Sequence, residues 1–212
     1  MDRRDVALHW RRPLAICFVA FTAAWIAFVI MLWKLQLVPD AARPWLRNAF
    51  WIGAAAIWVA WRRPPERRRW MGLWPITLRQ AGLALAAFGL IVSWNLLRVH
   101  VLASPLGKLA AATPISLAWG FVGVFAEELL FRGVIQTQIA EGTRIAWAIL
   151  VTTILFLAIH IPGWIILAIP IGAPEVATVF LVGVICGILR AWSQSLWPAV
   201  FAHWANNLGA MI

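Results

Sequence analysis

Seven long apolar stretches run through the sequence and constrain its fold more than any other feature. A helix needs about 20 mostly apolar residues to cross a hydrocarbon core of about 30 Å. The first stretch is too long for a typical cleaved signal peptide, so we expect it to stay as a span. We predict an all-α polytopic transmembrane helix bundle of about seven to eight spans. The expected spans are residues 13–33, 45–61, 81–99, 114–140, 145–161, 176–191 and 196–212, and the proline-broken segment 162–174 is either re-entrant or a short helix.

The composition supports lipid as the solvent of this chain. Hydrophobic residues make up 63% of it and charged residues only 12%, with a mean hydropathy of +0.84. A soluble domain carries about 25% charged residues. The sixteen tryptophans agree with a membrane protein, because indole favours the boundary between headgroups and acyl chains. We expect a single membrane domain over residues 1–212, in which residues 1–109 hold N-terminal spans of unassigned role.

The net charge of +10 reflects membrane topology and predicts no nucleic-acid partner. The basic residues sit in short loops between apolar runs and form no stripe with aromatic residues. With a cytoplasmic N-terminus, the inside segments hold twelve Lys and Arg residues and the outside segments hold five. The positive-inside rule therefore predicts an integral membrane protein with a cytoplasmic N-terminus. The high Ala, Arg and Trp content suggests a bacterium, and hence its inner or plasma membrane.

Three charged residues interrupt the predicted span 114–140. They are Glu127, Glu128 and Arg132, and each costs roughly 2.5–3.5 kcal/mol near a helix centre. Glu128 and Arg132 stand four residues apart and can pair on one helix face. Glu127 is rotated about 100° away from that pair and is free for another role. A purely structural ion-pair network explains Glu128 and Arg132 but not the second carboxylate.

Two further spans carry polar residues that we expect at the same place. His160 ends the span 145–161, and His203 and Asn207 lie four apart in the last span. Asn206 is expected to point elsewhere. Intramembrane ionisable groups face the bundle interior or a wet cavity, so these side chains would converge on one cavity. Taken singly, each histidine is more often a structural hydrogen-bonding group than a catalyst.

Other polar residues and the cysteines call for structural interpretations. Cys17 and Cys186 lie in apolar stretches and are predicted to pack in the core. Asn95 and His100 are predicted to be helix contacts or interface groups. Glu175 opens the sixth span, where a helix N-terminus favours an acidic residue.

The converging residue types suit the attack of water on an amide. Glu127 beside an imidazole can hold a water molecule and take its proton. His203 and Asn207 can donate hydrogen bonds to a developing oxyanion. Arg132 would keep Glu128 ionised and hold the helix in place.

At these residues the chain resembles the CPBP family of intramembrane proteases, which includes CAAX prenyl protease 2 and Abi-type proteins. The family pattern appears in order as Glu-Glu-x-x-x-Arg at 127–132, Phe-x-x-x-His at 156–160 and His-x-x-x-Asn at 203–207. The resemblance covers residues 110–212 and implies a CPBP/Abi-like catalytic core there. It implies that Glu127 and His160 activate water, that His203 and Asn207 stabilise the oxyanion, and that Glu128 and Arg132 are supporting residues.

The resemblance implies a glutamate-type endopeptidase that cuts a membrane-anchored protein or peptide within the lipid bilayer. We expect no cofactor and no metal; zinc is the less favoured alternative, because the chain has no His-Glu-x-x-His helix. A non-proteolytic peptide-binding or bacteriocin-immunity factor using the same cavity is the second hypothesis. A small proton-coupled transporter is the third, although only one broken segment is visible where such folds carry pairs.

Overall fold

The computed structural model describes residues 3–101 and 113–209, and within these ranges every regular element is a helix. This confirms the all-α fold. The elements are α1 (Arg3–Val29), η1 (Ile30–Lys34), η2 (Asp40–Ala42), α2 (Arg43–Arg62), α3 (Arg67–Trp70), α4 (Leu78–Val101), α5 (Pro114–Glu128), η4 (Leu129–Gln136), α6 (Thr137–Gly142), α7 (Ile145–Ala158), α8 (His160–Ile166), α9 (Ala173–Ser193) and α10 (Trp197–Gly209).

Five helical segments in the described part are long and apolar enough to cross a membrane. Arg47 and Asn48 make α2 more polar, and α10 has 13 residues, so these two helices are outside that set. The predicted number of about seven to eight spans therefore stays a prediction. The five segments are Ala15–Lys34, Leu78–Leu97, Pro114–Gly142, Ile145–Ile166 and Ala173–Ser193.

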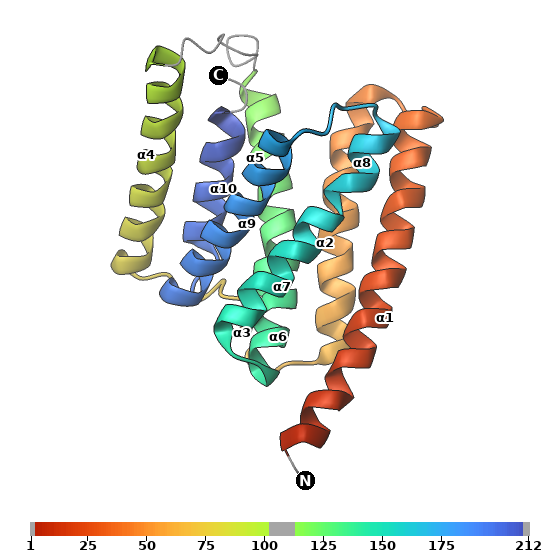
Figure 1. Ribbon diagram of the computed structural model, residues 1–212, viewed down its shortest axis with the longest axis vertical. Helices are drawn as coiled ribbons and strands as arrows, with labels where there is room; N and C mark the ends of the chain where they lie inside the picture. Colours follow the sequence, from red (N-terminus) through yellow and green to blue (C-terminus); the bar gives the residue numbers. More distant parts are fainter. Residues whose placement is uncertain (1–2, 102–112, 210–212) are drawn as a thin grey trace.

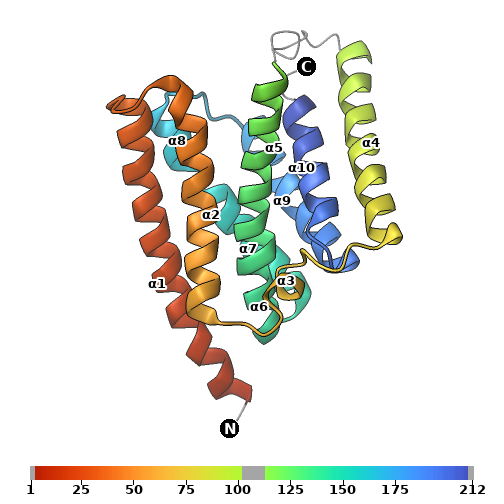
Figure 2. The same cartoon turned by 180° about the vertical axis from the view of Figure 1, so that it is seen from behind.

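The proline-broken segment forms the short helix α8 and a loop. Pro162 stands in the first turn of α8, where a missing backbone N–H disrupts no helical hydrogen bond. In both views α8 lies at the same end of the bundle as the turn between α1 and α2, and the chain then returns through α9 (Figures 1 and 2). Accordingly, the start of α1 and the end of α10 lie at opposite ends of the bundle.

Aromatic side chains join the first two helices to the centre of the molecule. The rings of Trp25 on α1 and Trp51 on α2 are 4.8 Å apart, and Trp51 lies 5.8 Å from Phe131 of η4. Trp25 also donates a hydrogen bond to the carbonyl of Ile159, at 3.1 Å. Large buried aromatic surfaces dominate core energetics, so α1 and α2 are an integral part of the fold.

Side-chain amides make two further connections between helices. Asn48 of α2 donates from its amide to the carbonyl of Trp119 on α5 at 3.3 Å. Asn95 of α4 donates to the carbonyl of Ala205 on α10, also at 3.3 Å, which confirms Asn95 as a helix contact. Buried amides are costly unless paired, so these bonds help to fix which helices are neighbours. The side chain of His100 lies outside the described residues.

The remaining structural predictions hold where the residues are described. Cys17 and Cys186 are both free. Cys186 is fully buried between α9 and α10, whereas Cys17 is only partly buried and packs against the edge of the core. Glu175 accepts a hydrogen bond from the backbone N–H of Gly172 at 2.9 Å and so caps the start of α9.

Candidate active site

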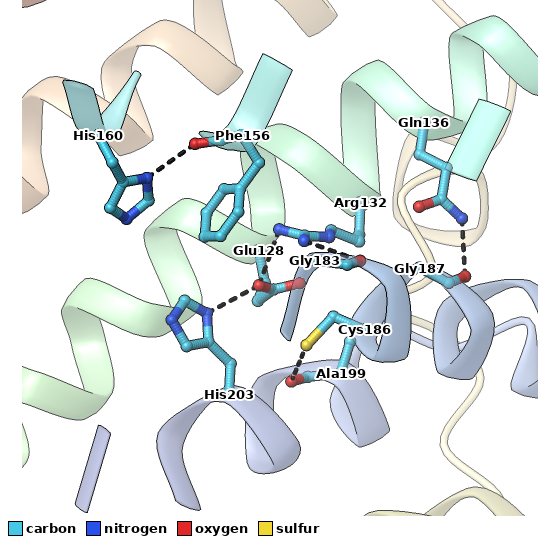
Figure 3. A network of polar contacts seen from close by, with 10 residues as sticks. All are labelled: Glu128, Arg132, Gln136, Phe156, His160, Gly183, Cys186, Gly187, Ala199 and His203. Carbon is cyan, nitrogen blue, oxygen red and sulfur yellow. Dashed lines mark hydrogen bonds and ion pairs between the residues drawn. The ribbon is translucent and has the colours of Figure 1, made fainter. Parts of the chain in front are cut away.

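Glu128 lies at the centre of a buried polar network. Its side chain is 0% exposed, and Oε1 accepts from Arg132 Nη1 at 3.0 Å and from His203 Nδ1 at 2.8 Å (Figure 3). Arg132 is also 0% exposed. Breaking such a buried pair by removing one partner costs about 3–5 kcal/mol. The network therefore fixes the relative position of α5, η4 and α10.

Arg132 also fixes two further helices around this carboxylate. Its Nη2 donates to the carbonyl of Gly183 on α9 at 3.1 Å, and its guanidinium carbon stands 4.3 Å from the ring centroid of Phe156 on α7. Gln136, one turn further along, donates to the carbonyl of Gly187 at 2.9 Å. Glycines at 183 and 187 expose their carbonyls and let the helix backbones approach closely. We did not single out Gln136, although its spacing of four from Arg132 places it on the same face.

Glu127, the adjacent carboxylate, lines a cavity of about 140 Å³. His160, His203 and Asn207 line the same cavity, so the four predicted catalytic residues are brought together. A cavity that holds water needs at least about 10–15 Å³ and several polar partners, and this one offers both. The structure thus separates the adjacent carboxylates, one paired and buried, the other partly exposed at the cavity wall.

The hydrogen bonds of the two histidines define which ring nitrogen faces the cavity. His160 Nδ1 is 2.7 Å from the carbonyl of Phe156, which can only accept, so Nδ1 carries the proton. In neutral His160, Nε2 then holds a lone pair. His203 Nδ1 is bonded to the Glu128 carboxylate, and its Nε2 is a donor only when the ring is protonated.

Asn206 corrects one of our predictions. We expected it to point away from the site, but it lines the cavity and its Nδ2 donates to Asn207 Oδ1 at 3.4 Å. Positions three apart on a helix share a face nearly as well as positions four apart, so Asn206 follows His203. Thr178 of α9 also lines the cavity, and nothing in the sequence distinguished it from other polar residues of apolar helices.

A second, larger cleft of about 860 Å³ shares two of its lining residues with this cavity. Glu127 and Asn207 line both spaces. The walls of the larger cleft include Trp33 from η1, Trp45 from α2 and Trp119 from α5. Residues between Trp33 and Arg47 therefore shape the approach to Glu127.

Among residues 15–97 and 113–209, no three His, Cys, Asp or Glu side chains are grouped so as to hold a metal ion. The expectation that the protein works without a metal stays a prediction.

The apolar helical bundle and its polar site define an integral membrane protein with a polar cavity between its helices. Residues 109–209 match the family described as type II CAAX prenyl endopeptidase, Rce1-like, and this part of the chain, which carries the three motifs, is therefore similar to the protease family that they indicate. No curated protein and no solved structure matches the chain.

Proposed function

We propose that this chain is an intramembrane endopeptidase that hydrolyses a peptide bond with water activated by Glu127 and His160. One observation carries the proposal: Glu127, His160, His203 and Asn207, from three separate helical segments, line one cavity large enough for water. The hydrogen bond between Glu128 and His203 joins α5, which carries Glu127, to α10, which carries His203 and Asn207. The match to an endopeptidase family supports the reaction class.

The geometry suggests a role for each group. Glu127 accepts a proton from the attacking water, and His160 Nε2 offers a second acceptor at the same cavity. The water oxygen bonds to the carbonyl carbon, which becomes tetrahedral, and the C–N bond then breaks. The proton held by Glu127 passes to the leaving nitrogen, so that a carboxylic acid and an amine are released.

His203 and Asn207 are proposed to stabilise the oxyanion of that intermediate. The Oδ1 of Asn207 already accepts from Asn206, which leaves its NH₂ group to donate into the cavity. A protonated His203 would donate from Nε2 while Glu128 balances its charge through Nδ1. Preorganised donors of this kind contribute about 10²–10³ in kcat each.

The proposed substrate is a membrane-anchored protein or a peptide tail. The 860 Å³ cleft has room for a peptide segment, and its tryptophans suit a polypeptide at the edge of a bilayer. Cleavage without a metal and a glutamate-type mechanism are parts of the same proposal.

The test is a mass-spectrometric survey of protein termini in cells with the wild-type chain, Glu127→Gln or Glu66→Gln. Gln keeps the shape of Glu and loses the base, so termini near membrane anchors should disappear in Glu127→Gln. Glu66 is exposed and remote from the cavity, and its variant should match wild type. Identical termini in all three, with Glu127→Gln present at a normal level, would overturn the proposal and favour a peptide-binding factor.

A further inference from the structure

We infer that the cleft receives its substrate from the side of the membrane opposite the cytoplasm, so that the substrate is an exported polypeptide held by a membrane anchor. The inference rests on the proposed function. It goes further by stating which face of the membrane presents the peptide bond, and it depends on where the cleft, the charges and the packed core lie along the bundle.

The 860 Å³ cleft opens at one end of the bundle. Its walls include Asp40 and Trp45, from the turn before α2 and its first residues, Ile115 and Trp119 from the start of α5, and Leu208 from the end of α10. These three helix ends lie at the same end of the molecule in both views (Figures 1 and 2). Asp40 is 88% exposed, so the mouth of the cleft is at the surface.

The opposite end carries the basic loops. There α2 ends, α3 follows, α4 begins, and the chain turns between α6 and α7 and between α9 and α10 (Figure 1). At the cleft end, the described basic side chains are Lys34, Arg43 and Arg47, and Arg43 pairs with Asp40 at 2.6 Å. The arginines of the opposite end are Arg62, Arg63, Arg67, Arg68, Arg69, Arg79, Arg144 and Arg190.

The positive-inside rule places the arginine-rich end in the cytoplasm. The rule counts Lys and Arg in short loops near the ends of the spans, and these loops are short. Anionic headgroups of the cytoplasmic leaflet also attract such a cluster. The mouth of the cleft then faces the other side.

The packing closes the route from the arginine-rich end. Glu127 stands 13 residues into α5, or about 20 Å from its start at a rise of 1.5 Å per residue. Between Glu128 and the arginine-rich end, the helices are filled by side chains that are 0% exposed, including Phe131, Val134 and Ile135 from η4 and Leu196 and Val200 near the start of α10. Of the two ends of the bundle, only the one with the cleft therefore gives access to Glu127.

The orientation can be measured without activity by labelling single cysteines with a membrane-impermeant maleimide in intact spheroplasts. Asp40→Cys should be labelled at once, and Glu66→Cys only after permeabilisation. Both original residues are exposed, at the cleft mouth and in the basic loop respectively. The parental chain, with Cys17 and Cys186 only, gives the background. Labelling of Glu66→Cys but not of Asp40→Cys in intact spheroplasts would overturn the inference.

A second measurement tests the route to the site. Ser116 is exposed and lines the cleft, so a bulky impermeant maleimide added outside should lower cleavage by Ser116→Cys at least about tenfold. The parental chain should be unaffected. Undiminished cleavage by fully labelled Ser116→Cys would overturn the route through the cleft. If labelling shows the reverse orientation and cleavage still depends on Glu127, this inference is wrong and the proposed function stands. If labelling shows the expected orientation but no cleavage depends on Glu127, the proposed function is wrong.

Discussion

His203 is bound through Nδ1 to Glu128 Oε1 at 2.8 Å, and this contact connects the buried ion pair to the cavity. Glu128 itself does not line the cavity, but its partner His203 does. A carboxylate that fixes the orientation and proton position of an imidazole is a recurrent arrangement in hydrolytic sites. Glu128 therefore both connects α5 to α10 and orients the ring of His203.

Arg132→Ala should destabilise the protein strongly. The substitution removes the guanidinium that pairs with Glu128 at 0% exposure and leaves this carboxylate with its hydrogen bond from His203, and breaking such a buried pair costs about 3–5 kcal/mol. We expect a lower folded yield and a lower melting temperature in detergent, together with lost activity. Arg68→Ala, an exposed arginine in the basic loop, serves as the matched control and should behave as wild type. Normal accumulation and full activity of Arg132→Ala would contradict the network described above.

Asn207→Ala should lower kcat by about 10²–10³ and change KM little, since the lost donor acts on the transition state. Asn206→Ala removes only the neighbour that orients Asn207, so its effect on kcat should be smaller. Steady-state kinetics on a purified substrate would measure both. Equal losses in the two variants would argue against Asn207 as the direct donor.

Gly183→Ala should separate α7 from α9. A Cβ at this position would meet Thr153 Cγ2 at 2.7 Å, closer than packed carbons approach, and overpacking of this kind costs about 1–3 kcal/mol. Thr153→Ala should rescue the variant in part, because it removes the clashing methyl group and a hydroxyl without a hydrogen-bond partner.

Gly89→Ala is the control for that experiment, since a Cβ there meets nothing within 4 Å. Thermal unfolding of the four proteins in detergent would measure the effect. A melting temperature of Gly183→Ala equal to that of wild type would show that the contact between α7 and α9 is not as close as described.

Metal removal should leave cleavage intact. Glu127 and His160 are proposed to activate water directly, so dialysis against a chelator should not change kcat by more than about twofold. Elemental analysis of the purified protein should find less than one zinc per chain. Loss of activity on dialysis that zinc restores would replace this mechanism with a metal-assisted one.

The helical fold and the polar residues of the site were accessible from the sequence for clear physical reasons. Charged groups are too costly in lipid to occur without a purpose, so Glu127 and Glu128 stood out among apolar neighbours. Asn206 was misplaced because we paired His203 only with the position four residues further on, although the position three residues further on shares nearly the same face.

The larger cleft was not predictable from periodicity. Its walls combine the turn before α2 with the start of α5 and the end of α10, and such a meeting of helix ends depends on tertiary packing. Arg132 could be predicted as the ion-pair partner of Glu128 because the two residues are four positions apart. The contact between Glu128 and His203 joins residues 75 positions apart. No local pattern specifies a contact of that length.

The fully buried layer that includes Phe131, Ile135, Leu196 and Val200 also has a consequence for the electrical state of the membrane. Each elementary charge that crosses a membrane potential of 100 mV dissipates about 2.3 kcal/mol. A water-filled cleft that passed through the whole bilayer would conduct protons and other ions down this gradient. Because the packed layer closes the cleft toward the arginine-rich end, water can reach Glu127 through the cleft while the membrane stays insulating.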